Sequence, residues 1–339
     1  MNRAGPSALV PLLLVGACSI GDSTLPTDPS PAGARRERLE RARDLLEAGD
    51  AEAARSLLEA AFGEGEERLR ERRLWQEAMI GLGREGEALE RARRSVEAGG
   101  GADALVLLAR LEPDDGQAES ALQEALELDP DHAWAEYGLG VLAARRGDLE
   151  VAEKRLTAAI DADDGFEEAL LRRAQVRDRL ADFEGSADDY RAYLERRPED
   201  VDALYDYATI VHRELFRPSE AEDLYRQLLR REPDHTEATV GLAVCLEERG
   251  RYEEAEELYL SVWSRAPSAL FNLGMLYQDR LGRYAEAREC FRRFLEIEPS
   301  PDGPAMSIAD RLIYAPLRLE ELERRLAHEG RAAGREVDG

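Results

Sequence analysis

Small and apolar residues recur along this chain at intervals of 30 to 35 residues, starting near residue 35. The small residue of each interval is Ala54, Ala88, Ala118, Ala152, Ser186, Ala221, Ala255 or Ala287. Four positions later stand Leu58, Ala92, Leu122, Leu156, Tyr190, Tyr225, Tyr259 and Phe291, and three further on come Ala61, Ser95, Ala125, Ala159, Tyr193, Leu228, Val262 and Phe294. An i, i+4, i+7 spacing places side chains on one face of an α-helix. The pattern therefore predicts a series of amphipathic helices, one in each interval.

A second helix is expected ahead of each of these helices. It carries a pair whose second member is small, as in Leu139-Gly140, Arg173-Ala174, Tyr207-Ala208, Leu242-Ala243 and Leu273-Gly274. A small residue lets two helices approach closely where they cross. Short turns, most of them containing Gly, follow at 146–149, 180–183, 249–252 and 281–284. Because Pro cannot continue a helix, most intervals close on one, at Pro130, Pro198, Pro233, Pro267 and Pro299.

A period of 34 that combines Leu-Gly, a turn Gly, a small residue, an aromatic residue and Pro resembles the tetratricopeptide repeat. The likeness covers about eight copies; the first three are degenerate, and the clearest are 133–166, 167–200, 201–235, 236–267 and 268–301. In the degenerate part, residues 99–117 are too short for a normal first helix. The resemblance implies an all-α fold, a right-handed α-solenoid of helix hairpins over 34–301, in which each repeat packs only on its neighbours.

The chain changes character after residue 301. Pro301 and Pro304 mark a break, and one apolar stripe follows at Ile308, Leu312, Ala315, Leu319, Leu322 and Leu326. We interpret 302–328 as a C-terminal capping helix that covers the end of the last repeat, as solenoids require. A helix for a partner or for dimerisation is the alternative, and 329–339 is expected to be a flexible tail.

Residues 1–17 have the features of a lipoprotein signal peptide. Arg3 precedes an apolar run at 8–17 that is too short to span a bilayer. Val15-Gly16-Ala17-Cys18 resembles the lipobox of bacterial lipoproteins, although that family prefers Leu at the Val15 position; the resemblance implies a lipid on Cys18. Residues 18–33 are rich in Pro, Ser and Thr and are expected to form a flexible tether.

The same resemblance predicts an address in the bacterial cell envelope. Ser19 follows the cysteine where Asp often marks retention in the inner membrane, which favours the outer membrane, facing the periplasm. Secretion without a lipid, and an intracellular chain whose leader has been misread, are the alternatives.

Charge narrows the range of partners. The chain has 46 basic and 72 acidic residues and a formal net charge of −26. Nucleic-acid binding is disfavoured, because phosphate contacts need a basic surface. The abundance of helix formers, with aromatic residues at only 6%, argues against an all-β fold.

Residues that carry chemistry are few. Cys245 and Cys290 lie within expected helices and are interpreted as buried small hydrophobes, with a disulfide as the alternative. His132 and His235 each follow Pro-Asp in loops and lack the spacing of a metal site. No phosphate-binding loop, nucleophile elbow or zinc-protease motif occurs. The sequence therefore predicts a protein that is not an enzyme and has no metal or cofactor.

The expected concave face, lined by the first helix of each repeat, carries the candidate partner-binding residues. Arg145, Arg179 and Arg213 fall 34 residues apart near the ends of three first helices, and aromatic residues accompany them; the full set is Trp134, Tyr137, Arg145, Arg179, Tyr205, His212 and Arg213. Two interpretations stay open. The arginines compensate helix dipoles while the rings pack between helices, or the set forms a groove for acidic or aromatic peptide segments.

These patterns predict a non-catalytic scaffold for protein–protein interactions, anchored to the envelope, that binds a protein or peptide partner in its groove. An intracellular adaptor and a subunit of an enzyme complex are the alternatives.

Overall fold

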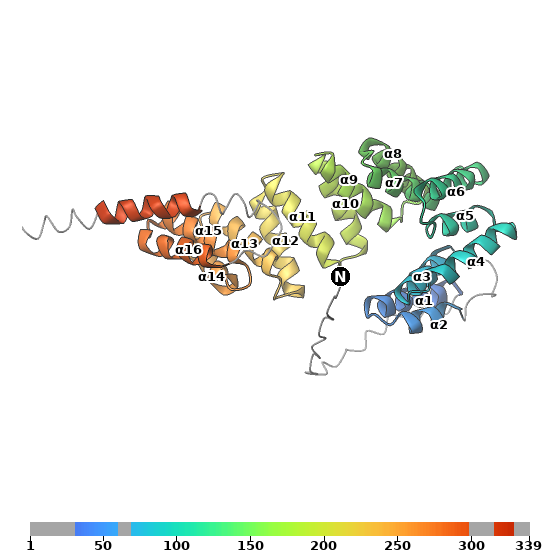
Figure 1. Cartoon of the computed structure of the whole chain (residues 1–339), viewed down its shortest axis with the longest axis horizontal. Coiled ribbons are helices and arrows are strands. Elements are labelled where there is room, and N and C mark those ends of the chain that lie inside the picture. Colours follow the sequence, from blue (N-terminus) through green and yellow to red (C-terminus); the bar gives the residue numbers. More distant parts are fainter. Residues whose placement is uncertain (1–30, 60–68, 298–314, 329–339) are drawn as a thin grey trace, which may run out of the picture. The chain divides into compact units, whose positions relative to one another are not determined.

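A computed structural model describes residues 31–59, 69–297 and 315–328 of the chain (Figure 1). The chain divides into two compact units, Met1–Arg94 and Ser95–Gly339. Within the described ranges the secondary structure is helical and no strand occurs. The predicted all-α fold, a solenoid of helix hairpins, is confirmed. The leader 1–17, Cys18 and most of the predicted tether lie outside the described residues, as do Ile308, Leu312 and the tail 329–339.

The first unit contains two helix pairs: α1 (Pro31–Glu47) with α2 (Ala51–Glu59), and α3 (Leu69–Gly81) with α4 (Glu85–Glu97), which crosses the division. Helix α1 begins inside the predicted tether, because Pro is well suited to the first turn of a helix. Gly49 and Gly83 take positive φ in the two tight turns. Trp75 on α3 is 5% exposed, donates its indole N–H to Glu59 of α2 at 3.0 Å and lies under the Arg91 guanidinium of α4 at 4.8 Å.

The second unit continues with six more hairpins. The first helices are α5 (Gly101–Ala109), α7 (Ala133–Arg146), α9 (Glu167–Arg179), α11 (Val201–Arg213), α13 (Thr236–Glu248) and α15 (Pro267–Leu276), the last extended by the π-turn η1 (Tyr277–Leu281). The second helices are α6 (Asp115–Leu128), α8 (Leu149–Ala162), α10 (Phe183–Arg196), α12 (Pro218–Arg231), α14 (Tyr252–Val262) and α16 (Tyr284–Glu296). Helix α5 has nine residues, whereas α7 has 14.

Each helix of the second unit packs on the one before and the one after it, from α5 to α16. First helices also meet across hairpins, α5 with α7, α7 with α9, α11 with α13 and α13 with α15, and neighbouring second helices in the described residues approach less closely. The first helices therefore line the inner side of this stack. This arrangement is the predicted nearest-neighbour packing, and its core runs without a break from Leu170 to Leu322.

Small residues sit where helices cross, as the sequence predicts. A Cβ added to Gly140 would lie 2.8 Å from Leu156 Cγ, and one added to Gly241 would lie 2.5 Å from the Tyr225 ring. Ala152 is completely buried beside the first of these crossings. The close approach therefore depends on the absence of a side chain at these positions.

A helix over 315–328 packs against the core of the last hairpins. Ala315 and Leu322 are 0% and 1% exposed, and the Arg325 guanidinium lies 3.8 Å from the centre of the Tyr284 ring on α16. Pro316 stands in the first turn of the described helix, where its missing N–H is tolerated. Of the described part of the predicted stripe, Ala315 and Leu322 are thus buried, and Leu319 and Leu326 are half-buried. None of the helices in the described ranges combines the length and the apolar character that crossing a membrane requires.

Candidate functional site

The aromatic residues predicted on α7 pack against the next repeat. Trp134 is 8% exposed, and its ring centre lies 4.1 Å from that of Phe166, which precedes α9. Tyr137 joins the same cluster, 5.7 Å from Trp134 and 5.2 Å from Phe166. These contacts bring the two predicted residues together, and they give both rings a packing role between hairpins.

Two of the three predicted arginines are held by groups of the preceding hairpin. Arg145 is exposed and forms an ion pair with Asp115 at 2.6 Å. Arg179 donates a hydrogen bond to the Ala144 carbonyl at 3.1 Å, in the last turn of α7. A cation at the C-terminus of a helix stabilises the exposed carbonyl groups there. The contact of Arg179 therefore favours the helix-end interpretation, whereas Arg145 forms its ion pair with a side chain at the start of α6.

The other three predicted residues gather on α11 around Tyr225. The rings of Tyr205 and His212 each lie 6.3 Å from the Tyr225 ring, and Tyr205 also stacks on His235 at 5.2 Å. His212 is 8% exposed, and its Nε2 lies 3.1 Å from Glu248 Oε2. Burial raises the pKa of Tyr205, and the nearby charge of Arg213 opposes that rise.

The guanidinium of Arg213 is exposed, and no described residue pairs with it. Helix α11 therefore carries a half-buried ring near its start, and a buried imidazole and an exposed cation at its end.

A row of tyrosines reaches the same side from the second helices. Tyr190, Tyr225 and Tyr259 are at most 2% exposed, and each hydroxyl bonds to a first helix. Tyr190 donates to Asp206 at 3.3 Å and Tyr259 to Glu247 at 3.3 Å, while the hydroxyls of Tyr225 and Thr209 lie 3.4 Å apart. Sequence reasoning missed this row because it treated these positions as core. Their signal was tyrosine at a position where other copies have Leu or Phe.

Carboxyl groups on the first helices have raised pKa values. Surrounding protein raises the pKa of the exposed Asp206, and the charges of Asp202 and Asp178 add to the rise while the Tyr190 hydroxyl opposes it. Partial burial also raises the pKa of Asp178, with a contribution from Glu214. On α13, burial raises the pKa of Glu247. Each ionised carboxylate is thus less stable than it would be in water.

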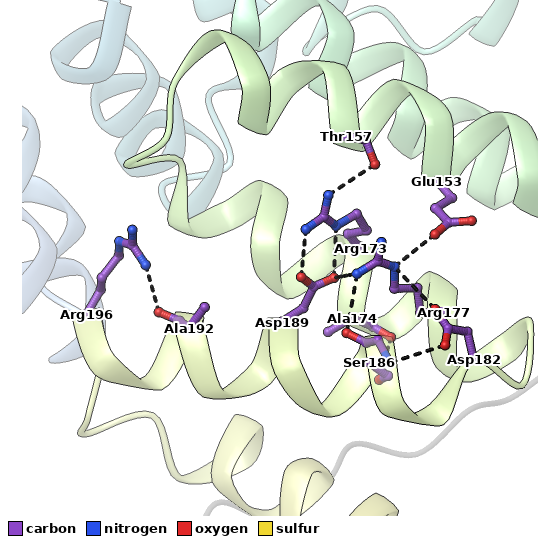
Figure 2. Close-up of polar contacts among 11 residues, drawn as sticks. Glu153, Thr157, Arg173, Ala174, Arg177, Asp182, Ser186, Asp189, Ala192 and Arg196 are labelled. Carbon is purple, nitrogen blue, oxygen red and sulfur yellow. Dashed lines mark hydrogen bonds and ion pairs between the residues drawn. The ribbon is translucent and has the colours of Figure 1, made fainter.

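A largely buried ion-pair network joins the α7–α8 hairpin to the α9–α10 hairpin (Figure 2). Arg173 holds Asp189 through two bonds of 2.7 and 2.9 Å and donates to the Thr157 hydroxyl at 3.1 Å. Arg177 reaches Asp189 at 3.0 Å and Glu153 at 2.8 Å. The side chain of Asp189 is 5% exposed and lies between the two guanidinium groups. This network links α8, α9 and α10, and its charges are satisfied within the fold.

A related ion pair recurs between hairpins. Four glutamates directly follow the small residue of a repeat, and each pairs with an Arg of the next hairpin, in the last turn of its first helix or in the turn that follows. The pairs are Glu119 with Arg146 at 2.6 Å, Glu153 with Arg177 at 2.8 Å, Glu222 with Arg251 at 2.7 Å and Glu256 with Arg283 at 2.9 Å. Because the pairs join successive repeats, they hold hairpins to one another. We assign them to the scaffold.

The cysteines and histidines are occupied within the fold. Cys245 and Cys290 are free thiols, 0% and 8% exposed, and burial raises the pKa of each to about 12. His132 and His235 cap α7 and α13 by accepting the Ala135 and Ala238 backbone N–H groups. Among the described residues, no group of three His, Cys, Asp or Glu side chains is placed to hold a metal ion. The side chains on the inner side can form hydrogen bonds, ion pairs and aromatic contacts, which are the interactions that bind a ligand.

Comparisons with known proteins find matches in the region that contains the candidate site. Family models described as tetratricopeptide repeat match residues 114–176 and 212–273, 171–215, and 267–301, so that together they cover more than half of the 339 residues. No curated protein matches this chain.

Solved structures resemble parts of the chain. YrrB, a TPR protein with an unusual peptide-binding site, is 22% identical, with a TM-score of 0.47 over 54% of this chain and 95% of its own. MamA protein is 17% identical, with a TM-score of 0.46 over 51% of this chain and 100% of its own. A tetratricopeptide repeat protein from Parabacteroides merdae is 25% identical, with a TM-score of 0.45 over 64% of this chain and 81% of its own.

Proposed function

Since this chain belongs to the tetratricopeptide repeat family, we propose that it is a non-catalytic scaffold of the bacterial cell envelope that binds a protein partner. The repeats supply the protein-interaction scaffold. The binding surface is the inner side formed by α9, α11 and α13, which we call the first-helix face. The partner is an extended or helical segment that lies along this face.

One observation carries the choice of this face. The buried Tyr190 and Tyr259 place their hydroxyls on Asp206 and Glu247, which belong to first helices. Contact with surrounding protein and neighbouring carboxylates raise the pKa of both carboxyls, so the ionised groups are destabilised before any ligand arrives, although Asp206 remains exposed to water. A cation from a partner would stabilise these ionised carboxylates directly. The face is therefore suited to a partner that brings positive charge.

The sequence alone favoured the opposite charge in the ligand, on the strength of the three arginines. In the structure, Arg145 and Arg179 have partners within the chain, and Arg213 is exposed with no partner among the described residues. We therefore propose a basic segment at the centre of the face, with Tyr205, His212 and Arg213 beside it. Trp134 and Tyr137, together with the two paired arginines, belong to the N-terminal part of the same side.

The anchor is proposed from the leader. A lipid on Cys18 would hold the chain at the membrane, and the tether that follows would let the repeats reach a partner. Ser19 after the cysteine supports the outer membrane as the site. Cys18→Ala tests the anchor: with a fatty-acid analogue in the growth medium, the wild-type chain should be labelled and the variant should not. Labelled variant, or unlabelled wild type, contradicts the anchor without affecting the binding face.

The binding face is tested by affinity capture from envelope extracts with full-length chains. Asp178→Asn with Asp206→Asn removes two charges from the first-helix face. Glu150→Gln with Glu195→Gln removes two charges from exposed positions on α8 and α10 and serves as the control. The partner should be depleted in the first capture and retained in the second. Equal recovery with both variants would place the binding surface elsewhere.

A further inference from the structure

Seven of the turns inside the hairpins share one backbone feature, and two of these seven depart from the residue type that suits it. In each of these turns, the residue two places before the second helix takes a positive φ. It is glycine in five turns, at Gly49, Gly83, Gly147, Gly250 and Gly282. Positive φ is strained for a residue with a Cβ. In the turn between α9 and α10 the residue is Ala181, with φ 60°. Between α11 and α12 it is Phe216, with φ 53°.

Phe216 combines this strain with exposure. Its side chain is 81% exposed, the largest exposed fraction among the exposed large hydrophobic residues of the described chain. The turn that holds it spans four residues, 214–217, where the turn between α7 and α8 spans two. The backbone is fixed from both sides, because Arg217 N–H donates to the Val211 carbonyl at 3.0 Å and Leu215 N–H to the Ile210 carbonyl at 3.1 Å. Phe216 is therefore held outward by an ordered turn.

Exposure alone would not call for an explanation. Leu128 and Val151 are 60% and 52% exposed, and both lie in regular helices where their backbone is unstrained. Phe216 differs because its backbone would be more stable with glycine and its ring gains almost no burial in the free chain. A strained residue that the fold does not use points to a role in binding.

The charged residues near Phe216 include the exposed Arg213 and two carboxylates. Glu214 lies two residues before it and Asp178 at the end of α9, and neither has an ion-pair partner among the described residues. The two charges are close enough for Glu214 to contribute to the raised pKa of Asp178. Arg217 is paired with Glu184 of the preceding hairpin, which joins the two turns and offsets its charge.

We propose that Phe216 is an anchor residue that inserts into an apolar pocket of a partner protein whose rim carries Lys or Arg. Burying the ring would recover the apolar surface that the free chain leaves in water. The basic rim would meet Glu214 and Asp178, which in the free chain repel one another. The carboxylates of Glu214 and Asp178 disfavour an anionic lipid surface as the occupant. This turn adjoins the first-helix face, to which Asp178 also belongs, and one partner can contact both.

The strain is tested first, on the free chain. Phe216→Gly should fold and should raise Tm by about 2–4 °C, because glycine accepts the positive φ. Ala181→Gly is the matched control, since it relieves the same strain one hairpin earlier without removing a ring. A lower Tm for Phe216→Gly would show that the ring stabilises the free fold, and the anchor proposal would be lost.

Crosslinking tests whether a partner protein receives the Phe216 ring. A benzoyl-phenylalanine at position 216 in the full-length chain, irradiated in cells, should crosslink to one protein, at an apolar residue that has Lys or Arg beside it. The purified partner should then bind Phe216→Gly at least tenfold more weakly than wild type and Ala181→Gly with unchanged Kd. Glu214→Gln should weaken binding severalfold, and added salt should reduce that difference.

Three outcomes would overturn the proposal: crosslinks to lipid, crosslinks only to a second copy of the chain, or equal Kd values for wild type and Phe216→Gly. Binding of Phe216→Gly to vesicles of phosphatidylethanolamine and phosphatidylglycerol should equal that of wild type. If Phe216→Gly binds normally while the Asp178 and Asp206 double variant does not, the anchor fails and the first-helix face stands.

Discussion

Tyr190 on α10 donates a hydrogen bond of 3.3 Å to Asp206 on α11, the first helix of the next hairpin. The ring of Tyr190 is 2% exposed, whereas Asp206 is exposed on the inner side of the stack. A residue of the core thus reaches the surface on which we place the partner. The bond couples the packing of two hairpins to the ionisation of a carboxylate on the first-helix face.

The first prediction concerns this bond. Tyr190→Phe should keep the fold and cost about 0.5–1.5 kcal/mol, because one hydrogen bond is lost and water can still solvate the exposed Asp206. The pKa of Asp206 should rise further, since the hydroxyl now lowers it. NMR titration of the Asp206 carboxyl in wild type and variant measures the change. A lower pKa in Tyr190→Phe would contradict the role given to the hydroxyl.

The second prediction concerns pH. Asp178, Asp206 and Glu247 have raised pKa values in the fold, so the folded state binds protons that the unfolded state releases between the unfolded and folded pKa values. At a pH above the pKa values of the folded state, these carboxyls therefore lower the free energy of unfolding. At a pH below the pKa values of the unfolded state, this effect disappears. The variant with Asn, Asn and Gln at these positions should be more stable than wild type at pH 7.

The same variant should lose this advantage as the pH falls through the titration of the carboxyls. Urea unfolding at a series of pH values checks the trend, with Glu150→Gln and Glu195→Gln as a control that should show no such change. A difference that grows at low pH would have the wrong sign.

The third prediction concerns the network in Figure 2. Asp189→Asn should cost about 3–5 kcal/mol, because it leaves the half-buried Arg173 and Arg177 without their shared carboxylate. Asp188 precedes it on α10, and its side chain is 70% exposed beside Arg191. Asp188→Asn should cost only about 0–1 kcal/mol. Chemical denaturation of both variants gives the comparison, and similar losses would show that the network does not stabilise the fold.

The fourth prediction concerns modular stability. Gly140→Leu should cost about 1–3 kcal/mol by overpacking, because the new side chain would meet Leu156 and the Ala152 backbone. Hydrogen exchange should accelerate mainly within 99–200 and change little beyond 236, since repeats depend on their neighbours. Uniform loss of protection along the chain would contradict nearest-neighbour packing.

The repeat could be predicted from sequence because its signals are local. Gly140, the small residues and the closing prolines each act within one hairpin, so their spacing was enough to predict the helices and the crossing that the structure confirms. The nine-residue α5 followed from the same reasoning, since too few positions separate its neighbours.

The site depended on contacts between hairpins, which spacing does not reveal. Arg145 forms an ion pair with Asp115, which lies 30 residues earlier in the sequence, and no local sequence pattern connects these two residues. The target of the Tyr190 hydroxyl likewise depends on how two hairpins stack. Phe216 left a signal that could have been used, because alignment of the turns places it where most copies have glycine.

The central claim is that the first-helix face binds a basic segment of a partner protein. Isothermal titration calorimetry of the captured partner against full-length chains measures it most directly. Asp178→Asn with Asp206→Asn should raise Kd about tenfold or more relative to wild type, and Glu150→Gln with Glu195→Gln should leave Kd within about twofold. Equal Kd values for wild type and both double variants would show that the first-helix face is not the binding surface.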